Sequence, residues 1–132
     1  MEIWDISYRR DVFGALGLLR GQWTVAVLST LATGELQYKE ILAEVNNSEA
    51  RIGWSSHGNP LSDRVLSDTL RRARSRGLVD RRSEARMFGP VWYRLTPIGQ
   101  SLLYAARPLG DWAEHHRDVV HGAMRWSPRS VV

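Results

Sequence analysis

The segment Leu61–Gly77, LSDRVLSDTLRRARSRG, constrains the fold of this 132-residue chain more than any other. Ser62 is suited to start a helix, because its hydroxyl can accept hydrogen bonds from the free N–H groups of a first turn. Leu66 and Leu70 follow at a spacing of four, which places them on one helical face. Gly77 can adopt the left-handed conformation with which many helices end. The segment therefore predicts an amphipathic helix bounded by Ser62 and Gly77.

The opposite face of this helix is polar and rich in arginine. The segment that follows it, Leu78–Leu95, predicts two strands joined by a basic turn. A capped helix followed by a basic hairpin is the layout of a winged helix-turn-helix. The polar residues of the predicted helix are Ser62, Asp63, Arg64, Ser67, Asp68, Arg71 and Arg74.

Positive charge gathers on the same part of the chain. Residues 61–94 carry nine arginines and four acidic residues, whereas residues 1–60 carry five basic and seven acidic residues. An arginine-rich helix face is often only a solvated surface. The concentration of positive charge on one helix and on the hairpin that follows it instead favours an interface with a phosphate backbone. The expected partner is therefore double-stranded DNA.

The remaining periodic segments predict further helices. An arm over residues 1–10 leads into a first helix, which Arg20-Gly21 breaks, and residues 22–32 predict a helix buried at the centre of the domain. Tyr38–Val45 predicts an amphipathic helix that Asn46 and Asn47 end. After Thr96 another helical run begins, and Pro108 should kink or divide it near Ala106–Arg107.

These elements predict a mainly α fold with a small β-hairpin wing, in the α+β class. The C-terminal run carries an apolar stripe that a small domain cannot cover alone, which favours a homodimer. The predicted organisation is a single domain over 1–132, with a DNA-binding core over 10–96, dimerisation helices over 97–122 and a tail over 123–132.

The connection between the two predicted DNA-binding helices is unusually long. Such helices are normally joined by a few residues, whereas here residues 47–60 intervene. Two interpretations stay open: a tolerated insertion, or a functional loop whose Trp54 and His57 contact DNA or a ligand.

Several functional classes are disfavoured. The chain has no cysteine, which excludes disulfides, thiolate metal sites and thiol nucleophiles. No apolar run reaches the roughly 18–20 residues of a membrane span, so we expect a cytoplasmic protein without a membrane partner. His116 and His121 lack the spacing of an HExxH pair, so we expect no metal, no cofactor and no enzymatic activity. A small metal-dependent enzyme and a winged helix that binds only protein remain the alternatives.

Three blocks of the chain resemble the HxlR-type winged-helix transcriptional regulators, relatives of the MarR group. The blocks are Leu16–Leu42, Leu61–Arg82 and Val91–Leu103, and the tryptophan at Trp112 follows them. The most specific part is a run composed of Tyr93, Leu95, Thr96, Pro97 and Gly99.

The chain departs from the family pattern at three places. Arg10 stands where the family often has a cysteine, so sensing of oxidants through that thiol is not available here. Arg20 replaces the first glycine of a family pair, and Gln22 replaces a basic residue. The insertion over residues 48–60 puts a family-standard placement of the recognition helix in doubt.

The resemblance implies a homodimer that binds a near-palindromic operator through the helix from Ser62. Arg64 is the first candidate for a two-pronged contact to guanine. Asp63 is interpreted as a helix cap, and Asp68 either pairs with a neighbouring arginine or accepts from a cytosine amino group. The wing residues expected to grip phosphate or enter the minor groove are Arg81, Arg82 and Arg86.

The six tryptophans leave room for a ligand hypothesis. Packing in the core or the dimer interface is the simpler interpretation, but a flat aromatic effector would stack well on such rings. The tryptophans expected to line its pocket are Trp23, Trp92 and Trp112, with Trp54 as a lid.

Overall fold

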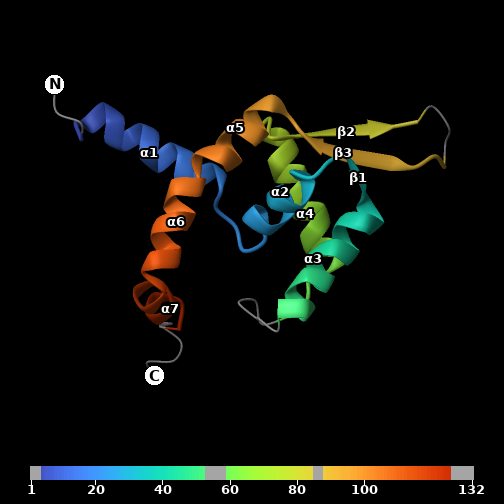
Figure 1. Ribbon diagram of the computed structural model, residues 1–132. Helices are drawn as coiled ribbons and strands as arrows, with labels where there is room; N and C mark the ends of the chain where they lie inside the picture. Colours follow the sequence, from blue (N-terminus) through green and yellow to red (C-terminus); the bar gives the residue numbers. More distant parts are fainter. Residues whose placement is uncertain (1–3, 53–58, 85–87, 126–132) are drawn as a thin grey trace.

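The computed structural model describes residues 4–52, 59–84 and 88–125. It shows a mainly helical chain with one small antiparallel sheet, which confirms the predicted α+β winged helix-turn-helix (Figure 1). The elements are, in chain order, α1 (Ile6–Leu18), α2 (Thr24–Leu31), β1 (Leu36–Gln37), α3 (Tyr38–Ile52), α4 (Asp63–Ser75), β2 (Val79–Ser83), β3 (Val91–Leu95), α5 (Pro97–Ala105), α6 (Arg107–His115) and α7 (Arg117–Arg125).

The first helix begins earlier than the sequence predicted. The Asp5 carboxylate accepts a hydrogen bond from the backbone N–H of Tyr8 at 2.8 Å and so caps α1. Residues 6–10 are therefore helical, and the prediction of an arm over residues 1–10 was wrong for them. None of the residues of α1 is buried, and this helix extends away from the rest of the chain (Figure 1).

The prediction of a central buried helix is confirmed by α2. Its Val27, Leu28 and Leu31 are almost completely enclosed, and Trp23, the residue before the helix, is 4% exposed. They belong to one core that the inner faces of α3 and α4 and the base of the sheet complete. This core fixes the position of α4 relative to the sheet.

The third helix continues past the residues that were predicted to end it. It runs to Ile52, because the side chain of Asn46 does not compete for the backbone of its own helix. The Asn46 amide instead accepts from the backbone N–H of Leu61 at 2.8 Å and donates to its carbonyl at 3.1 Å. The insertion that was predicted as a loop is thus helical in its first residues, whereas Trp54 and His57 lie outside the described part.

We expect Asn46→Ala to lower the free energy of unfolding by about 1–3 kcal/mol. The variant removes both hydrogen bonds to Leu61, the residue directly before the cap of α4, and leaves that part-buried backbone unpaired. Urea unfolding measures the loss, and the exposed neighbour Asn47→Ala is the control. Equal midpoints for the two variants would contradict this function of Asn46.

The wing belongs to a three-stranded sheet in the order β1-β3-β2. Two strands were predicted, and β1 was missed because two residues are too short to show alternation. Strand β1 pairs Leu36 with Tyr93, and β2 pairs Val79 with Leu95. The hairpin of β2 and β3 projects from the body of the molecule (Figure 1).

The turn from the wing into α5 is locked by Thr96 and Gly99. The Thr96 hydroxyl caps α5 by accepting from the N–H of Gly99 at 3.0 Å, and it donates to the Gly77 carbonyl at 2.6 Å. A Cβ atom on Gly99 would lie 2.1 Å from the carbonyl oxygen of Leu78. The helix therefore rests directly on the backbone that follows α4, and only glycine permits this approach.

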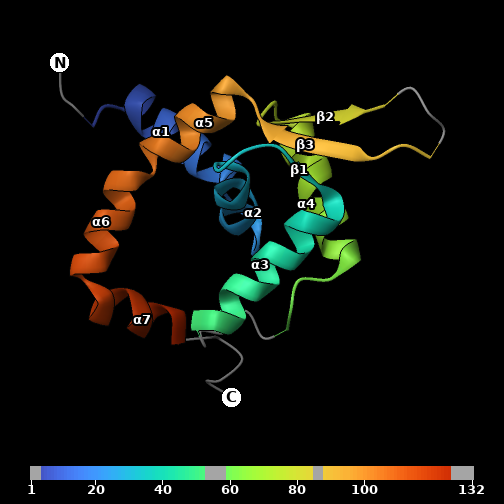
Figure 2. The ribbon, with the colours of Figure 1, turned by 45° about the vertical axis from the view of Figure 1, so that its right-hand side comes forward.

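The C-terminal segment is divided into three short helices. The predicted break near Ala106–Arg107 is confirmed, and a second break, which was not predicted, occurs at His116, where φ is −128° and ψ is 40°. Helix α6 extends away from the core in both views, and α7 turns sharply from the end of α6 (Figures 1 and 2). None of the described helices is long and apolar enough to cross a membrane.

Candidate nucleic-acid interface

Helix α4 presents the polar face that the sequence predicted. Ser62 caps it by accepting from the N–H of Val65 at 3.3 Å, and Leu66, Leu70 and Ala73 of the helix are buried in the core. Asp63 lies in the first turn, where the helix dipole favours a negative charge. The exposed polar residues of the helix include Arg64, Ser67, Arg71 and Arg74.

Tyr38, at the start of α3, holds α4 in place. Its hydroxyl donates to the backbone carbonyl of Asp63 at 2.7 Å and lies 3.1 Å from the Ser67 hydroxyl. Partial burial raises the pKa of Tyr38, so its hydroxyl stays protonated as a donor. From the sequence, Tyr38 was predicted only to lie on an apolar face, and this contact between the two helices was not predicted.

Asp68 and Arg64, both on α4, differ in whether their side chains already have a partner within the described part of the chain. Asp68 lies 2.8 Å from Arg71, the intrahelical pair that was one of its two interpretations. Arg64 makes no ion pair or hydrogen bond with the residues that the structure describes. Its exposed guanidinium therefore keeps its donors for an acceptor outside the chain.

A basic groove lies between the second half of α4 and the first wing strand. It has a volume of about 460 Å³, and Arg71 and Arg74 line it from the helix, while Arg81 lines it from β2. Ser75 adds a hydroxyl, and Asp80 is the acidic residue among the described lining residues. Three guanidinium groups on one groove can bind the oxygens of a phosphate from two directions.

The two neighbouring arginines of β2 lie on opposite faces of the sheet. Arg81 is paired in register with the buried Tyr93, on the face that packs against the helices. Arg82 is paired with Trp92, on the other face, where its guanidinium lies 2.6 Å from a carboxylate oxygen of Glu35. Arg86, the third predicted wing residue, lies outside the described residues.

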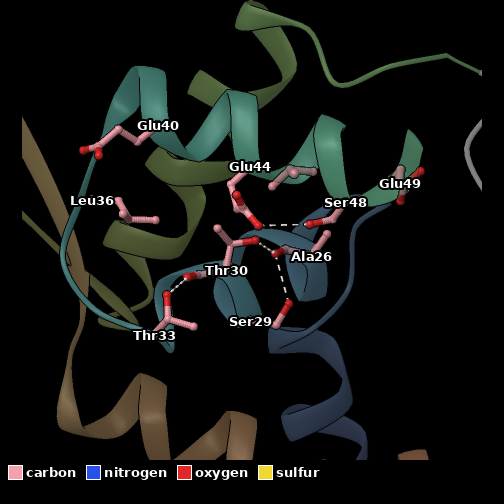
Figure 3. Close-up of a pocket in the computed structure, with 10 residues that line it drawn as sticks. Ala26, Ser29, Thr30, Thr33, Leu36, Glu40, Glu44, Ser48 and Glu49 are labelled. Atoms are coloured by element: carbon pink, nitrogen blue, oxygen red, sulfur yellow. Dashed lines mark hydrogen bonds between the residues drawn. The ribbon is translucent and has the colours of Figure 1, made fainter. Parts of the chain in front are cut away.

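A second groove, between α2 and α3, has the opposite electrostatic character. It has a volume of about 510 Å³, and glutamates of α3 stand along it (Figure 3). Glu44 accepts from the Ser48 hydroxyl at 3.2 Å and from Arg51 at 3.4 Å. Its described lining residues are Ala26, Ser29, Thr30, Thr33, Leu36, Glu40, Glu44, Val45, Ser48 and Glu49. These carboxylates would repel a phosphate backbone.

Comparisons with known proteins agree with this geometry. The model of the HxlR-like helix-turn-helix family matches residues 18–121. The chain belongs to the HxlR-like helix-turn-helix family. This places it among helix-turn-helix transcriptional regulators and confirms the resemblance found in the sequence.

Relatives of this HxlR-like chain agree in sequence and fold. An uncharacterized HTH-type transcriptional regulator of Methanothermobacter thermautotrophicus is 28% identical over 110 residues, which cover 83% of this chain and 74% of the relative. A MarR-family regulator of Enterococcus faecalis has a TM-score of 0.66 at 25% identity, over 92% of this chain and 96% of that one. Diamide-treated YodB of Bacillus subtilis has the same fold, with a TM-score of 0.59 at 20% identity and coverage of 86% and 96%.

Three of the tryptophans predicted to line a ligand pocket are described in this HxlR-like chain, and they lie on different parts of the fold. Trp23 belongs to the core, Trp92 is half-buried on β3, and Trp112 on α6 is 51% exposed and stacks on His116 with ring centroids 4.3 Å apart. Trp54 lies outside the described residues. None of the described residues that line the groove in Figure 3 is a tryptophan.

Across the described ranges, no group of three or more His, Cys, Asp or Glu side chains is arranged to hold a metal ion.

Proposed function

We propose that this chain is a sequence-specific regulator that binds double-stranded DNA as a homodimer. The observation that carries the proposal is the convergence of Arg71, Arg74 and Arg81 on one groove, beside a capped helix that displays Arg64. The acidic groove on α2 and α3 leaves the α4 side as the one suited to a polyanion.

Helix α4 would lie in the major groove with its N-terminal half toward the bases. Arg64 is exposed in the first turn, where a long side chain reaches base edges. Its planar guanidinium matches the O6 and N7 acceptors of guanine. The Ser67 hydroxyl, already near Tyr38, is suited to a flanking phosphate or a base edge.

The basic groove would hold the DNA backbone. When a helix lies in the major groove and a wing reaches the adjacent minor groove, the phosphate strand between the two grooves passes between helix and wing. Arg74 and Arg81 approach that path from its two sides. This assigns them to phosphate, which positions the protein without selecting sequence.

Selection of bound duplexes from a random pool tests the proposal. We expect enriched near-palindromic sites, and we expect Arg64→Ala to lose about 1–3 kcal/mol of preference at one position in each half-site. Arg117→Ala on α7 is the control, because it removes the same charge from another element. No enrichment from any pool, with binding to a protein partner instead, would favour the alternative of a winged helix that binds only protein.

The homodimer would form through α1 and the C-terminal helices. Phe13 on α1 is 78% exposed and Ile98 on α5 is 66% exposed, and Leu109 and Trp112 on α6 are each more than half exposed. Large exposed apolar patches of this kind mark protein interfaces. A two-fold dimer would place two copies of α4 about 34 Å apart, the length of one DNA turn.

We expect sedimentation velocity to show a dimer at micromolar concentration and Phe13→Asp with Leu109→Asp to convert it to a monomer. Two charges inside an apolar interface lose their hydration without a partner. Phe88→Asp is the matched control, since Phe88 is 94% exposed but lies at the wing. A monomeric wild-type chain would refute the assembly.

We also propose that a flat aromatic effector binds to this protein. The exposed Trp112, stacked on His116 at this apolar surface, supports it, because a planar ligand can stack on such a ring. Quenching of tryptophan fluorescence by a compound that also changes DNA affinity is the expected result. If Trp112→Phe does not alter this response, the ring has no part in binding the effector.

A further inference from the structure

Arg82 is held by two contacts on the face of the sheet that points away from α4. Its guanidinium lies 2.6 and 3.5 Å from the two carboxylate oxygens of Glu35, and 5.5 Å from the ring centroid of Trp92. The Glu35 side chain is itself 29% exposed. Arg82 thus has an anion and an aromatic face within its own chain, whereas Arg81 lines the basic groove on the other side.

These contacts cross the whole sheet. Glu35 directly precedes β1, Trp92 lies on the central strand β3, and Arg82 lies on β2 at the far edge. The register brings Gln37, Trp92 and Arg82 into one row across the three strands. The ion pair therefore ties the wing strand to the segment that leads into α3.

That segment is also connected to α4. Strand β1 runs directly into α3, whose first residue is Tyr38, and the Tyr38 hydroxyl donates to the backbone of Asp63 at 2.7 Å. The angle between wing and α4 is therefore constrained from both ends of β1. The Arg82 guanidinium also lowers the pKa of Glu35, so the pair stays charged at neutral pH.

We propose that Glu35 and Arg82 form a brace, with Trp92 beneath it, that sets the angle of the wing relative to α4, and that Arg82 does not contact DNA. Of the adjacent arginines, Arg81 binds phosphate and Arg82 is a positioning residue. The expected effect of the brace on DNA binding rests on the proposed function. The contacts that form the brace are present in the free protein. Arg81 and Arg82, which were both predicted to contact DNA, thus have different functions.

Salt dependence of duplex binding separates the two arginines. Arg81→Ala removes one phosphate contact from each subunit of the dimer, so the slope of log K against log salt concentration should fall by about 1.8, at about 0.9 for each contact. Arg82→Ala and Glu35→Gln should leave the slope unchanged and weaken every duplex alike, by less than about tenfold. The double variant should lose no more affinity than either single variant, because both remove the same interaction.

Two results would overturn the brace. One is a slope for Arg82→Ala that falls as it does for Arg81→Ala. The other is tighter binding by Glu35→Gln, which would mean that Arg82 had been released to phosphate.

A measurement without DNA keeps this test separate from the proposed function. In ¹H–¹⁵N spectra of the free protein, Glu35→Gln and Arg82→Ala should shift a common set of signals. This set should include the indole N–H of Trp92, which is identified by its absence in Trp92→Phe. Arg81→Ala should leave that indole signal in place. If the wild-type chain binds no duplex, the proposed function fails, but the spectra still test the brace. If Glu35→Gln and Arg82→Ala then shift unrelated sets of signals, the brace is overturned as well.

Discussion

Replacing Gly99 with alanine is expected to lower the free energy of unfolding by at least about 3 kcal/mol, a large part of the stability of a domain this size. The new Cβ would lie 2.1 Å from the Leu78 carbonyl oxygen and 3.0 Å from the carbonyl carbon. Neither can move aside easily, because the same carbonyl accepts the backbone N–H of Thr96 at 3.0 Å. Helix α5 would have to separate from the backbone that joins α4 to the wing.

Thermal unfolding followed by circular dichroism measures this loss. Gly110→Ala is the matched control, because a Cβ on Gly110, in α6, would meet no described atom from another part of the chain within 4 Å. There alanine should be neutral or stabilising by about 0.5–1 kcal/mol, since glycine loses more backbone freedom in a helix. Equal melting temperatures for Gly99→Ala and the wild type would show that α5 can be displaced without cost.

Removal of the three arginines of the basic groove is expected to have the largest effect on DNA binding. Arg71→Ala, Arg74→Ala and Arg81→Ala combined remove three phosphate contacts from each subunit of the dimer, so the slope of log K against log salt should fall by about 5.4. At about 150 mM salt, the loss of six such contacts corresponds to roughly ten-thousandfold lower affinity. Because phosphate carries no sequence information, all duplexes should be weakened alike.

Fluorescence anisotropy with a labelled duplex measures both quantities. A charge-matched variant with Arg20, Lys39 and Arg51 changed to alanine is the control, since these exposed residues lie outside α4, the wing and the helices proposed for the dimer interface. If both triple variants lose affinity equally, net charge alone accounts for binding and the groove has no special function.

Much of the DNA-binding unit was predictable because its signals are local. The cap at Ser62, the buried leucines of α4 and the turn at Gly77 all follow from neighbours in sequence, and the structure confirms each of them. Gly77 has a φ of 75°, the conformation for which glycine was expected. The break near Arg107 follows in the same way from a proline.

The errors arose where a distant partner decides the outcome. Asn46 was predicted to end its helix, but its amide binds Leu61, fifteen residues away. Strand β1 exists because the central strand of the sheet pairs with it. The separation of Arg81 from Arg82 follows from the sheet register and from Glu35, none of which a count of arginines reveals.

The most direct test of the central claim is the affinity of the wild-type chain for duplex DNA from a selected near-palindromic site, measured between 50 and 200 mM salt. A dimer that binds through α4 and the wing should make about six to ten phosphate contacts and lose roughly 10³–10⁵ in affinity over this range. An unrelated duplex of equal length should bind more weakly at each concentration. Binding that does not change with salt, or equal affinity for both duplexes, would contradict sequence-specific recognition by this surface.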